Sequence, residues 1–178
     1  MILHLVRHPP VAKHWQRCCY GQSDPGLSRA GQAMIAVLVD ELVALKPDVV
    51  LHSDMKRTRA LALPLADRLG VVSITAPLWR ERDFGDWEGQ SWNAIYRKTG
   101  NAMDGMIDAP DDFRPGGGET TGELSERIKM AVHALPGTRS VIIITHGGPI
   151  ACVCAARAGA KLQQLAAFVP PTASIITV

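Results

Sequence analysis

The stretch Ile2-Leu3-His4-Leu5-Val6-Arg7-His8-Pro9-Pro10 decides how the rest of the chain is organised. Its apolar first half predicts a short buried strand. The two prolines have no N–H group to donate to a strand ladder, so the strand must end there. Arg7 and His8 are then left at the carboxyl end of a strand, where open α/β sheets bind their ligands. A cation beside an imidazole at such an edge indicates chemistry on an anion.

Length and composition limit the classes of protein to consider. A chain of 178 residues predicts one domain, 1–178, with a sizeable core. A net charge of +2 without long basic runs argues against nucleic-acid binding, and an aromatic content of 5% argues against a base-stacking surface. No apolar stretch approaches the ~20 residues that span a bilayer, and no signal-peptide pattern precedes the first strand. We therefore expect a cytoplasmic protein without nucleic-acid or membrane partners.

The cysteines do not suggest a metal or redox site. They occur as Cys18-Cys19 and Cys152-x-Cys154, and neither spacing is that of a zinc knuckle or a redox motif. We therefore expect the four cysteines to be free thiols without a metal-binding or redox role, in a reducing compartment.

Strand patterns alternate with helix patterns along the chain. This predicts a three-layer α/β sandwich with a largely parallel central sheet and helices on both faces. After the first strand, further strands are expected at 49–52, 71–75, 141–145 and 173–178. Helices are expected at 28–45, 55–69, 92–98, onward from the Thr120-x-x-Glu123 capping box, and at 149–158, with a kink or break at Pro64. Residues 76–118 are the least regular part and predict a small cap region.

Two further residues join the first stretch at the same edge of the predicted sheet. Arg57 comes one turn into the helix after the second strand, and His146 follows the strand at 141–145. Guanidinium groups match phosphate oxygens, and an imidazole can attack phosphorus and carry the phosphoryl group covalently. The leaving oxygen then needs an acid, and Glu81 is the candidate. That role requires a carboxyl group that is unusually basic or is held against the leaving group.

Five motifs support this interpretation and occur in a fixed order. They are Leu5-Val6-Arg7-His8, Ser53-x-x-Lys56-Arg57-Thr58, Glu81-x-x-Phe84-Gly85-Asp86-Trp87-Glu88-Gly89, Gly118-Glu119-Thr120 with Arg127, and Thr145-His146-Gly147. Together they resemble the motifs of the histidine phosphatase superfamily, which includes the cofactor-dependent phosphoglycerate mutases. The resemblance covers nearly the whole chain and implies a phosphoglycerate mutase-like fold.

The resemblance also implies a role for each residue. His8 would be the nucleophile that becomes phosphorylated, and Glu81 would be the proton donor. Arg7, Arg57 and His146, with Gly147 beside them, would bind the phosphoryl group of a small phosphorylated metabolite. No metal or other cofactor would be required. A metal site made of His8, His146 and Glu81 is the alternative, and the adjacent arginines argue against it because they would repel a cation.

One departure from the family lies directly after His8. The family usually continues with polar residues, whereas this chain continues Pro9-Pro10-Val11-Ala12. The stretch Cys19-Tyr20-Gly21-Gln22-Ser23-Asp24 resembles a segment of α-ribazole phosphatases, which act in cobalamin assembly. In that alignment Ser23 and Gln22 become candidate substrate contacts.

Three functions remain open at this stage. Net hydrolysis, with α-ribazole 5′-phosphate as one substrate, is favoured because the chain has room for only a modest cap. A phosphoglycerate mutase is the second reading, and a phospho-ligand binder without turnover is the third. A homodimer is left open.

Other conspicuous side chains receive plainer interpretations. His4 and His52 are expected to be structural, His133 to be solvated, and the role of His14 is left open. Trp79, Trp87 and Trp92 are expected mainly to pack the irregular segment, with a substrate-stacking wall as the alternative. Lys13, Arg17 and Arg82 are solvated charges unless they face the pocket, in which case they favour a polyanionic substrate.

Overall fold

A computed structural model describes all 178 residues, and its centre is a five-stranded sheet. The spatial order is β3-β2-β4-β1-β5. The first four strands pair in parallel and β5 pairs antiparallel with β1. The strands are β1 Ile2–Arg7, β2 Val49–His52, β3 Ser73–Thr75, β4 Ser140–Thr145 and β5 Ile175–Thr177. The largely parallel sheet predicted from the sequence is confirmed.

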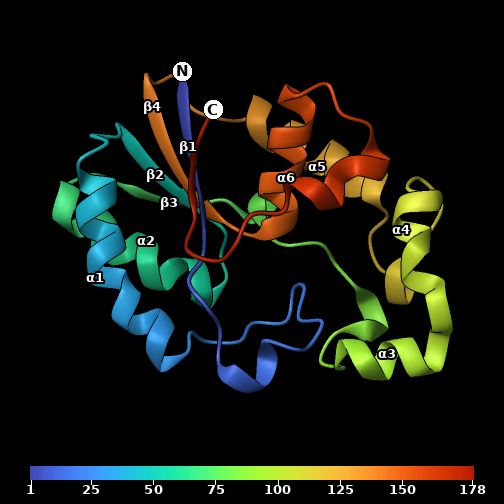
Figure 1. Ribbon diagram of the computed structural model, residues 1–178. Helices are drawn as coiled ribbons and strands as arrows, with labels where there is room; N and C mark the ends of the chain where they lie inside the picture. Colours follow the sequence, from blue (N-terminus) through green and yellow to red (C-terminus); the bar gives the residue numbers. More distant parts are fainter.

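Helices cover both faces of this sheet, as Figure 1 shows. One layer contains α1 (Arg29–Val43) and α2 (Lys56–Leu69), and the other contains α5 (Thr121–His133) and α6 (Gly147–Arg157). Two short helices, α3 (Trp92–Thr99) and α4 (Gly105–Asp108), lie beyond the second layer. The three-layer α/β fold is therefore present.

The alternation of side chains along β4 explains why its sequence is continuously apolar. Val141 and Ile143 pack in the core cluster with α5 and α6, whereas Ile142 and Ile144 pack in the cluster with α1 and α2. All four side chains are fully buried. A central parallel strand buries both of its faces in this way, so neither face tolerates polar residues.

The helix starts predicted from the sequence agree with the structure more closely than the helix interior predicted around Pro64 does. The hydroxyl of Ser28 accepts a hydrogen bond from Gly31 N at 2.9 Å, and Thr120 and Glu123 form the predicted capping box. The break predicted at Pro64 does not form, because α2 runs through it. Pro64 is exposed, while the opposite side of the helix buries Leu61 and Leu65 in the core. Burial of that face holds the helix together across the missing hydrogen bond.

Several boundaries differ from the sequence prediction. The third strand begins at Ser73 instead of at 71, and the last strand is limited to Ile175–Thr177. Helix α6 begins at Gly147 instead of at 149, and only His146 separates it from β4. A 3₁₀ segment at Leu162–Phe168 was not predicted at all. No helix is both long enough and apolar enough to span a membrane.

The cap region, 76–118, contains α3, α4 and short 3₁₀ segments. Trp79 belongs to the core beneath α5 and α6, and Trp87 packs with Ile95 in a small cluster of its own. Packing is therefore the role of these two tryptophans, as predicted. Trp92 packs against the same small cluster and also lines the cavity described below.

Candidate active site

The carboxyl ends of β1, β2 and β4 bring the predicted residues to one edge of the sheet. His8 follows β1, Arg57 lies in the first turn of α2 after β2, and His146 follows β4. The rings of His8 and His146 are 5.2 Å apart between centroids, and Arg57 Nε donates to His146 Nδ1 at 3.2 Å. Residues separated by more than 130 positions thus form one cluster, as the motif order required.

His8 is held as a neutral imidazole with one nitrogen free. Its Nδ1 donates to the carbonyl of Pro9 at 2.8 Å, and because a carbonyl can only accept, Nδ1 carries the proton. The lone pair of Nε2 has no protein partner and is available for attack. Burial, with Arg57 and Arg7 adding positive charge, lowers the pKa of His8 to about 3. The imidazole is therefore unprotonated at neutral pH.

His146 carries its proton on the opposite nitrogen. Its Nδ1 accepts from Arg57, so Nε2 bears the hydrogen and donates to Ser53 Oγ at 2.8 Å. The chain continues from Ser53 Oγ to Thr58 Oγ1 at 2.9 Å and from there to Met55 O at 2.8 Å. Burial and the nearby arginines lower the pKa of His146 well below its usual value. This relay fixes the ring orientation through the loop between β2 and α2.

Arg57 is fully buried and is anchored by backbone carbonyls. Its two terminal nitrogens donate to Gly21 O at 2.6 Å and Ser23 O at 2.7 Å, and its side chain lies 5.2 Å from the centre of the Tyr20 ring. Asp24 is a distant counter-ion at 3.9 Å. Because carbonyls and an aromatic face leave most of the positive charge uncompensated, the site attracts an anion.

Arg7 is fixed from the opposite side. One terminal nitrogen donates to the carbonyl of Pro170, while Nε is buried without a partner. A Cβ on Gly147 would lie 3.1 Å from Arg7 Cζ, so a glycine lets this guanidinium approach the start of α6 closely. The Nε–H group of Arg7 is therefore a buried hydrogen-bond donor without an acceptor in the protein.

Glu81 lies over the start of α6. Its Oε1 accepts from its neighbour's amide, Arg82 N, at 2.8 Å and from Gly148 N at 3.1 Å. A side chain at Gly148 would collide with the carboxylate, so this contact requires glycine. The carboxyl group is therefore held in place by backbone donors at the start of α6, and its role as the acid stays a prediction.

The two substrate contacts suggested by the α-ribazole phosphatase resemblance are engaged elsewhere. Glu88 accepts from Gln22 N at 2.8 Å, from Ser23 N at 2.6 Å and from Ser23 Oγ at 2.7 Å. Gln22 Nε2 donates to Glu81 O at 3.4 Å. In this structure the hydrogen bonds of Ser23 and Gln22 connect their loop to the cap region. Contact of these two residues with a substrate stays a prediction.

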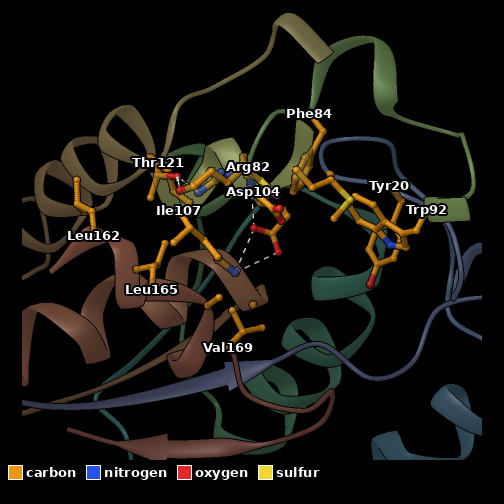
Figure 2. Close-up of a pocket in the computed structure, with 18 of the residues that line it drawn as sticks. Tyr20, Arg82, Phe84, Trp92, Asp104, Ile107, Thr121, Leu162, Leu165 and Val169 are labelled. Atoms are coloured by element: carbon orange, nitrogen blue, oxygen red, sulfur yellow. Dashed lines mark hydrogen bonds between the residues drawn. The ribbon is translucent and has the colours of Figure 1, made fainter. Parts of the chain in front are cut away.

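A cavity of about 520 Å³ opens beside these groups and is shown in Figure 2. Tyr20, Phe84 and Trp92 line one side, and Ile107, Leu162 and Leu165 line the other. Arg7, Glu81, Arg82 and Gly147 also line it. The cavity joins charged side chains of both signs, among them Arg7 and Glu81, to a mostly apolar wall, so it fits a small molecule with a polar end and a less polar body. His8, Arg57 and His146 lie outside this lining. The structure contains no cluster of three or more His, Cys, Asp or Glu side chains that could hold a metal ion.

Comparison with known proteins assigns the family. A sequence profile of the histidine phosphatase superfamily (branch 1) matches residues 3–178. The chain belongs to this superfamily. This histidine phosphatase is 30% identical over 175 residues to a glucosyl-3-phosphoglycerate phosphatase of Mycolicibacterium vanbaalenii, covering 91% of this chain and 76% of that protein. It is 27% identical to a probable phosphoglycerate mutase of Erwinia tasmaniensis, covering 82% and 69% of the two chains.

Solved structures agree with the histidine phosphatase fold. A mycobacterial glucosyl-3-phosphoglycerate phosphatase superposes with a TM-score of 0.85 at 25% identity, covering 99% of this chain and 88% of the other. The α-ribazole phosphatase of Shigella flexneri superposes with a TM-score of 0.87 at 19% identity, covering 99% and 89%. At that identity the second likeness concerns the fold alone.

Sequence reasoning about the histidine phosphatase site missed three contributors. Ser53, Thr58 and Glu88 belong to the motifs found in the sequence, but no role was predicted for them. The Pro9-Pro10 departure also has a structural use: Pro9 O orients His8, and Pro10 O accepts from Ser28 N at 2.9 Å at the start of α1. Ser53 and Thr58 lie in the same motif as Arg57, and Glu88 lies in the same motif as Glu81, which was the signal that could have identified them.

Replacing Glu88 with glutamine is expected to weaken phosphate binding about tenfold. The carboxylate holds the loop whose carbonyls hold Arg57, and loss of one charge-assisted hydrogen bond costs about 1.5 kcal/mol or more. Calorimetric titration with inorganic phosphate measures the effect, and Glu126→Gln, an exposed site, is the matched control. An unchanged dissociation constant in E88Q would show that the loop holds Arg57 without this carboxylate.

The buried neutral histidines predict acid sensitivity. At pH values between the ordinary pKa of histidine, 6.5, and the lowered pKa of His8 in the folded protein, about 3, His8 binds a proton in the unfolded chain but not in the folded chain. The free energy of unfolding should therefore fall as the pH is lowered below 6.5, by about 1.4 kcal/mol per pH unit for this residue. Urea unfolding from pH 7 to pH 5, followed by tryptophan fluorescence, measures the slope.

His8→Asn should reduce that slope by about 1.4 kcal/mol per pH unit, whereas His133→Asn, at an exposed position, should not change it. Equal slopes in the wild type and H8N would mean that His8 is not held neutral in the folded protein.

Proposed function

We propose that this histidine phosphatase is a metal-independent phosphomonoesterase that works through a phosphorylated His8. The observation that carries the proposal is the free Nε2 of a neutral, buried imidazole placed between two guanidinium groups and His146. A neutral nucleophile surrounded by fixed positive charge suits attack on a phosphate dianion, because the charge stabilises the transition state without blocking the lone pair.

In the first step His8 Nε2 attacks phosphorus and the bond from phosphorus to the ester oxygen breaks. Arg7 and Arg57 hold the phosphoryl oxygens, and the unpaired Nε–H of Arg7 gains an acceptor. Glu81 gives its proton to the leaving oxygen, so the product is a neutral alcohol. The proton on His8 Nδ1 stays on that nitrogen throughout, hydrogen-bonded to Pro9 O.

In the second step a water molecule attacks the phosphorus of phospho-His8. Glu81, now a carboxylate, accepts the proton of that water, and the bond between phosphorus and nitrogen breaks. Inorganic phosphate leaves and His8 returns to its neutral form. The same carboxyl group thus serves first as an acid and then as a base.

Hydrolysis is favoured over transfer to a second hydroxyl for two reasons. The relative at 30% identity is named a phosphatase, and the cap region of this chain, 76–118, is modest. The relative named a probable phosphoglycerate mutase keeps the mutase function as the second candidate. The substrate is proposed to be a small phosphorylated metabolite, and the apolar cavity wall keeps α-ribazole 5′-phosphate among the candidates.

The test is a phosphate-release screen with a chelator present. The panel contains p-nitrophenyl phosphate, α-ribazole 5′-phosphate, 3-phosphoglycerate and simple sugar phosphates. Release of inorganic phosphate from at least one alkyl phosphate is expected. Conversion of 3-phosphoglycerate to its 2-isomer without phosphate release would assign a mutase, and no turnover by the folded protein would assign a binding protein.

A further inference from the structure

Arg127 on α5 uses every N–H group of its guanidinium inside the protein. Its Nε and Nη2 each donate to a carboxylate oxygen of Glu119 at 2.8 Å. Its Nη1 donates to Leu78 O at 2.7 Å and to Arg80 O at 2.9 Å, and its Nη2 also donates to Glu81 O at 3.2 Å. A guanidinium has five N–H donors, so Arg127 has none left for a substrate.

The segment that carries Glu81 depends on such side-chain contacts. Residues 80–84 belong to no helix or strand, and the 3₁₀ segment before them ends at Trp79. Arg127 holds three of the four successive carbonyls from Leu78 to Glu81, and the fourth, Trp79 O, accepts from Thr145 Oγ1 at 2.6 Å. Because no ladder of backbone hydrogen bonds fixes this segment, its position is set mainly by Arg127 and by the end of β4.

The peptide group between Glu81 and Arg82 connects Arg127 with the Glu81 carboxylate. The oxygen of this group accepts from Arg127 Nη2, and its N–H donates to Glu81 Oε1 at 2.8 Å. The C=O and N–H of a planar trans peptide point in opposite directions, so a contact that fixes the oxygen also aims the N–H. Arg127 therefore acts on the carboxylate through one rigid group.

Other contacts of the same segment do not replace Arg127. Gln22 Nε2 reaches Glu81 O only at 3.4 Å. The side chain of Arg80 pairs with Asp54, but that ion pair is half-exposed and does not contact the peptide group after Glu81. The oxygen of that peptide group is thus held chiefly by Arg127.

We propose that Arg127, held by Glu119, is a positioning residue that places the Glu81 carboxyl group at the leaving oxygen of the substrate. This inference rests on the proposed phosphatase function, in which Glu81 supplies a proton. Arg127 does not line the cavity, so it acts through Glu81 and not on the substrate. The proposal gives a role to the motif Gly118-Glu119-Thr120 with Arg127, which the proposed mechanism does not otherwise use.

The experiment compares an alkyl substrate, glycerol 3-phosphate, with an aryl substrate, p-nitrophenyl phosphate. Arg127→Met is expected to lower kcat for the alkyl substrate by about 10- to 100-fold, because a displacement of about 1 Å in a catalytic group has an effect of that size. The aryl substrate should lose less than about threefold, since its leaving group departs without a proton. The selective loss is the result that supports the proposal.

Arg127→Lys is the second variant, used also if R127M does not fold. An ammonium group can keep the ion pair with Glu119, but its three donors on one nitrogen cannot span the carbonyls of Leu78, Arg80 and Glu81. R127K should therefore show the same selective loss at a smaller size, about 3- to 10-fold.

Arg114→Met is the matched control. It removes another arginine that pairs with a glutamate, Glu123, near the start of α5, but Arg114 does not contact residues 78–81. R114M should keep the wild-type ratio of alkyl to aryl turnover.

A double variant separates positioning of Glu81 from general damage to the fold. Glu81→Gln has no proton to transfer, so the exact position of residue 81 should matter little in that background. Adding R127M to E81Q should lower alkyl turnover by less than about threefold further, whereas independent effects would multiply. Multiplication of the two losses would overturn the proposal.

The remaining outcomes are equally decisive. A wild-type ratio in R127M or R127K overturns the proposal, and so do equal losses for both substrates, which would assign Arg127 to the fold in general. A selective loss in E81Q without one in the Arg127 variants leaves the proposed function intact and rejects this inference alone. Equal losses in E81Q, or a wild type that hydrolyses neither substrate, reject the proposed mechanism and this inference with it.

Discussion

His8→Ala is expected to lower the turnover of p-nitrophenyl phosphate by a factor on the order of 10⁴ or more. The imidazole supplies the only free, neutral nitrogen at the centre of the site, and Arg57 and His146 remain paired with each other when it is removed. The remaining groups can bind phosphate but cannot form the covalent intermediate. Phosphate release under saturating substrate measures the loss.

Two further measurements separate the chemistry from the fold. His133→Ala, at an exposed position, should leave turnover unchanged, and the circular dichroism of H8A should match that of the wild type. Rapid quenching of wild-type enzyme with radiolabelled substrate should trap a phosphoenzyme that is labile in acid and stable in alkali, and H8A should trap none. Retained activity in H8A would remove His8 as the nucleophile.

Glu81→Gln is expected to lower the turnover of alkyl phosphates by about 10²- to 10⁴-fold. Glutamine keeps an oxygen that can accept from Gly148 N and Arg82 N, so the geometry is preserved while the transferable proton is lost. p-Nitrophenyl phosphate should lose much less, because its leaving group departs as a stable anion without a proton. Kinetics of one alkyl and one aryl substrate measure the contrast.

Asp104→Asn is the matched control for E81Q, since Asp104 is a carboxylate that lines the same cavity but lies at its exposed side. It should leave the ratio of alkyl to aryl turnover as it is in the wild type. Equal losses for both substrates in E81Q would argue that Glu81 positions the site and does not supply a proton.

The sequence predicted the elements whose causes are local. Pro9-Pro10 ends the first strand because proline cannot donate to a ladder, and Ser28 begins a helix because its hydroxyl caps Gly31 N. The apolar run at 141–145 predicted a central strand buried on both faces. Since parallel strands end at one edge, these local features also placed His8, Arg57 and His146 together.

Other features depended on contacts between distant segments. The break expected at Pro64 failed because core packing of α2 outweighs one missing hydrogen bond. The roles of Ser23 and Gln22 depended on Glu88, which lies more than 60 residues away in the sequence. Polar side chains in a loop can contact either substrate or protein, and only the folded chain selects between them.

By itself, the sequence determined which groups meet at the sheet edge, because strand termination and helix capping act over a few residues. The tertiary structure decided which nitrogen of each histidine carries the proton and which arginine nitrogens are left without an acceptor. Those properties depend on burial and on partners from remote segments, which the spacing of residues along the chain does not record.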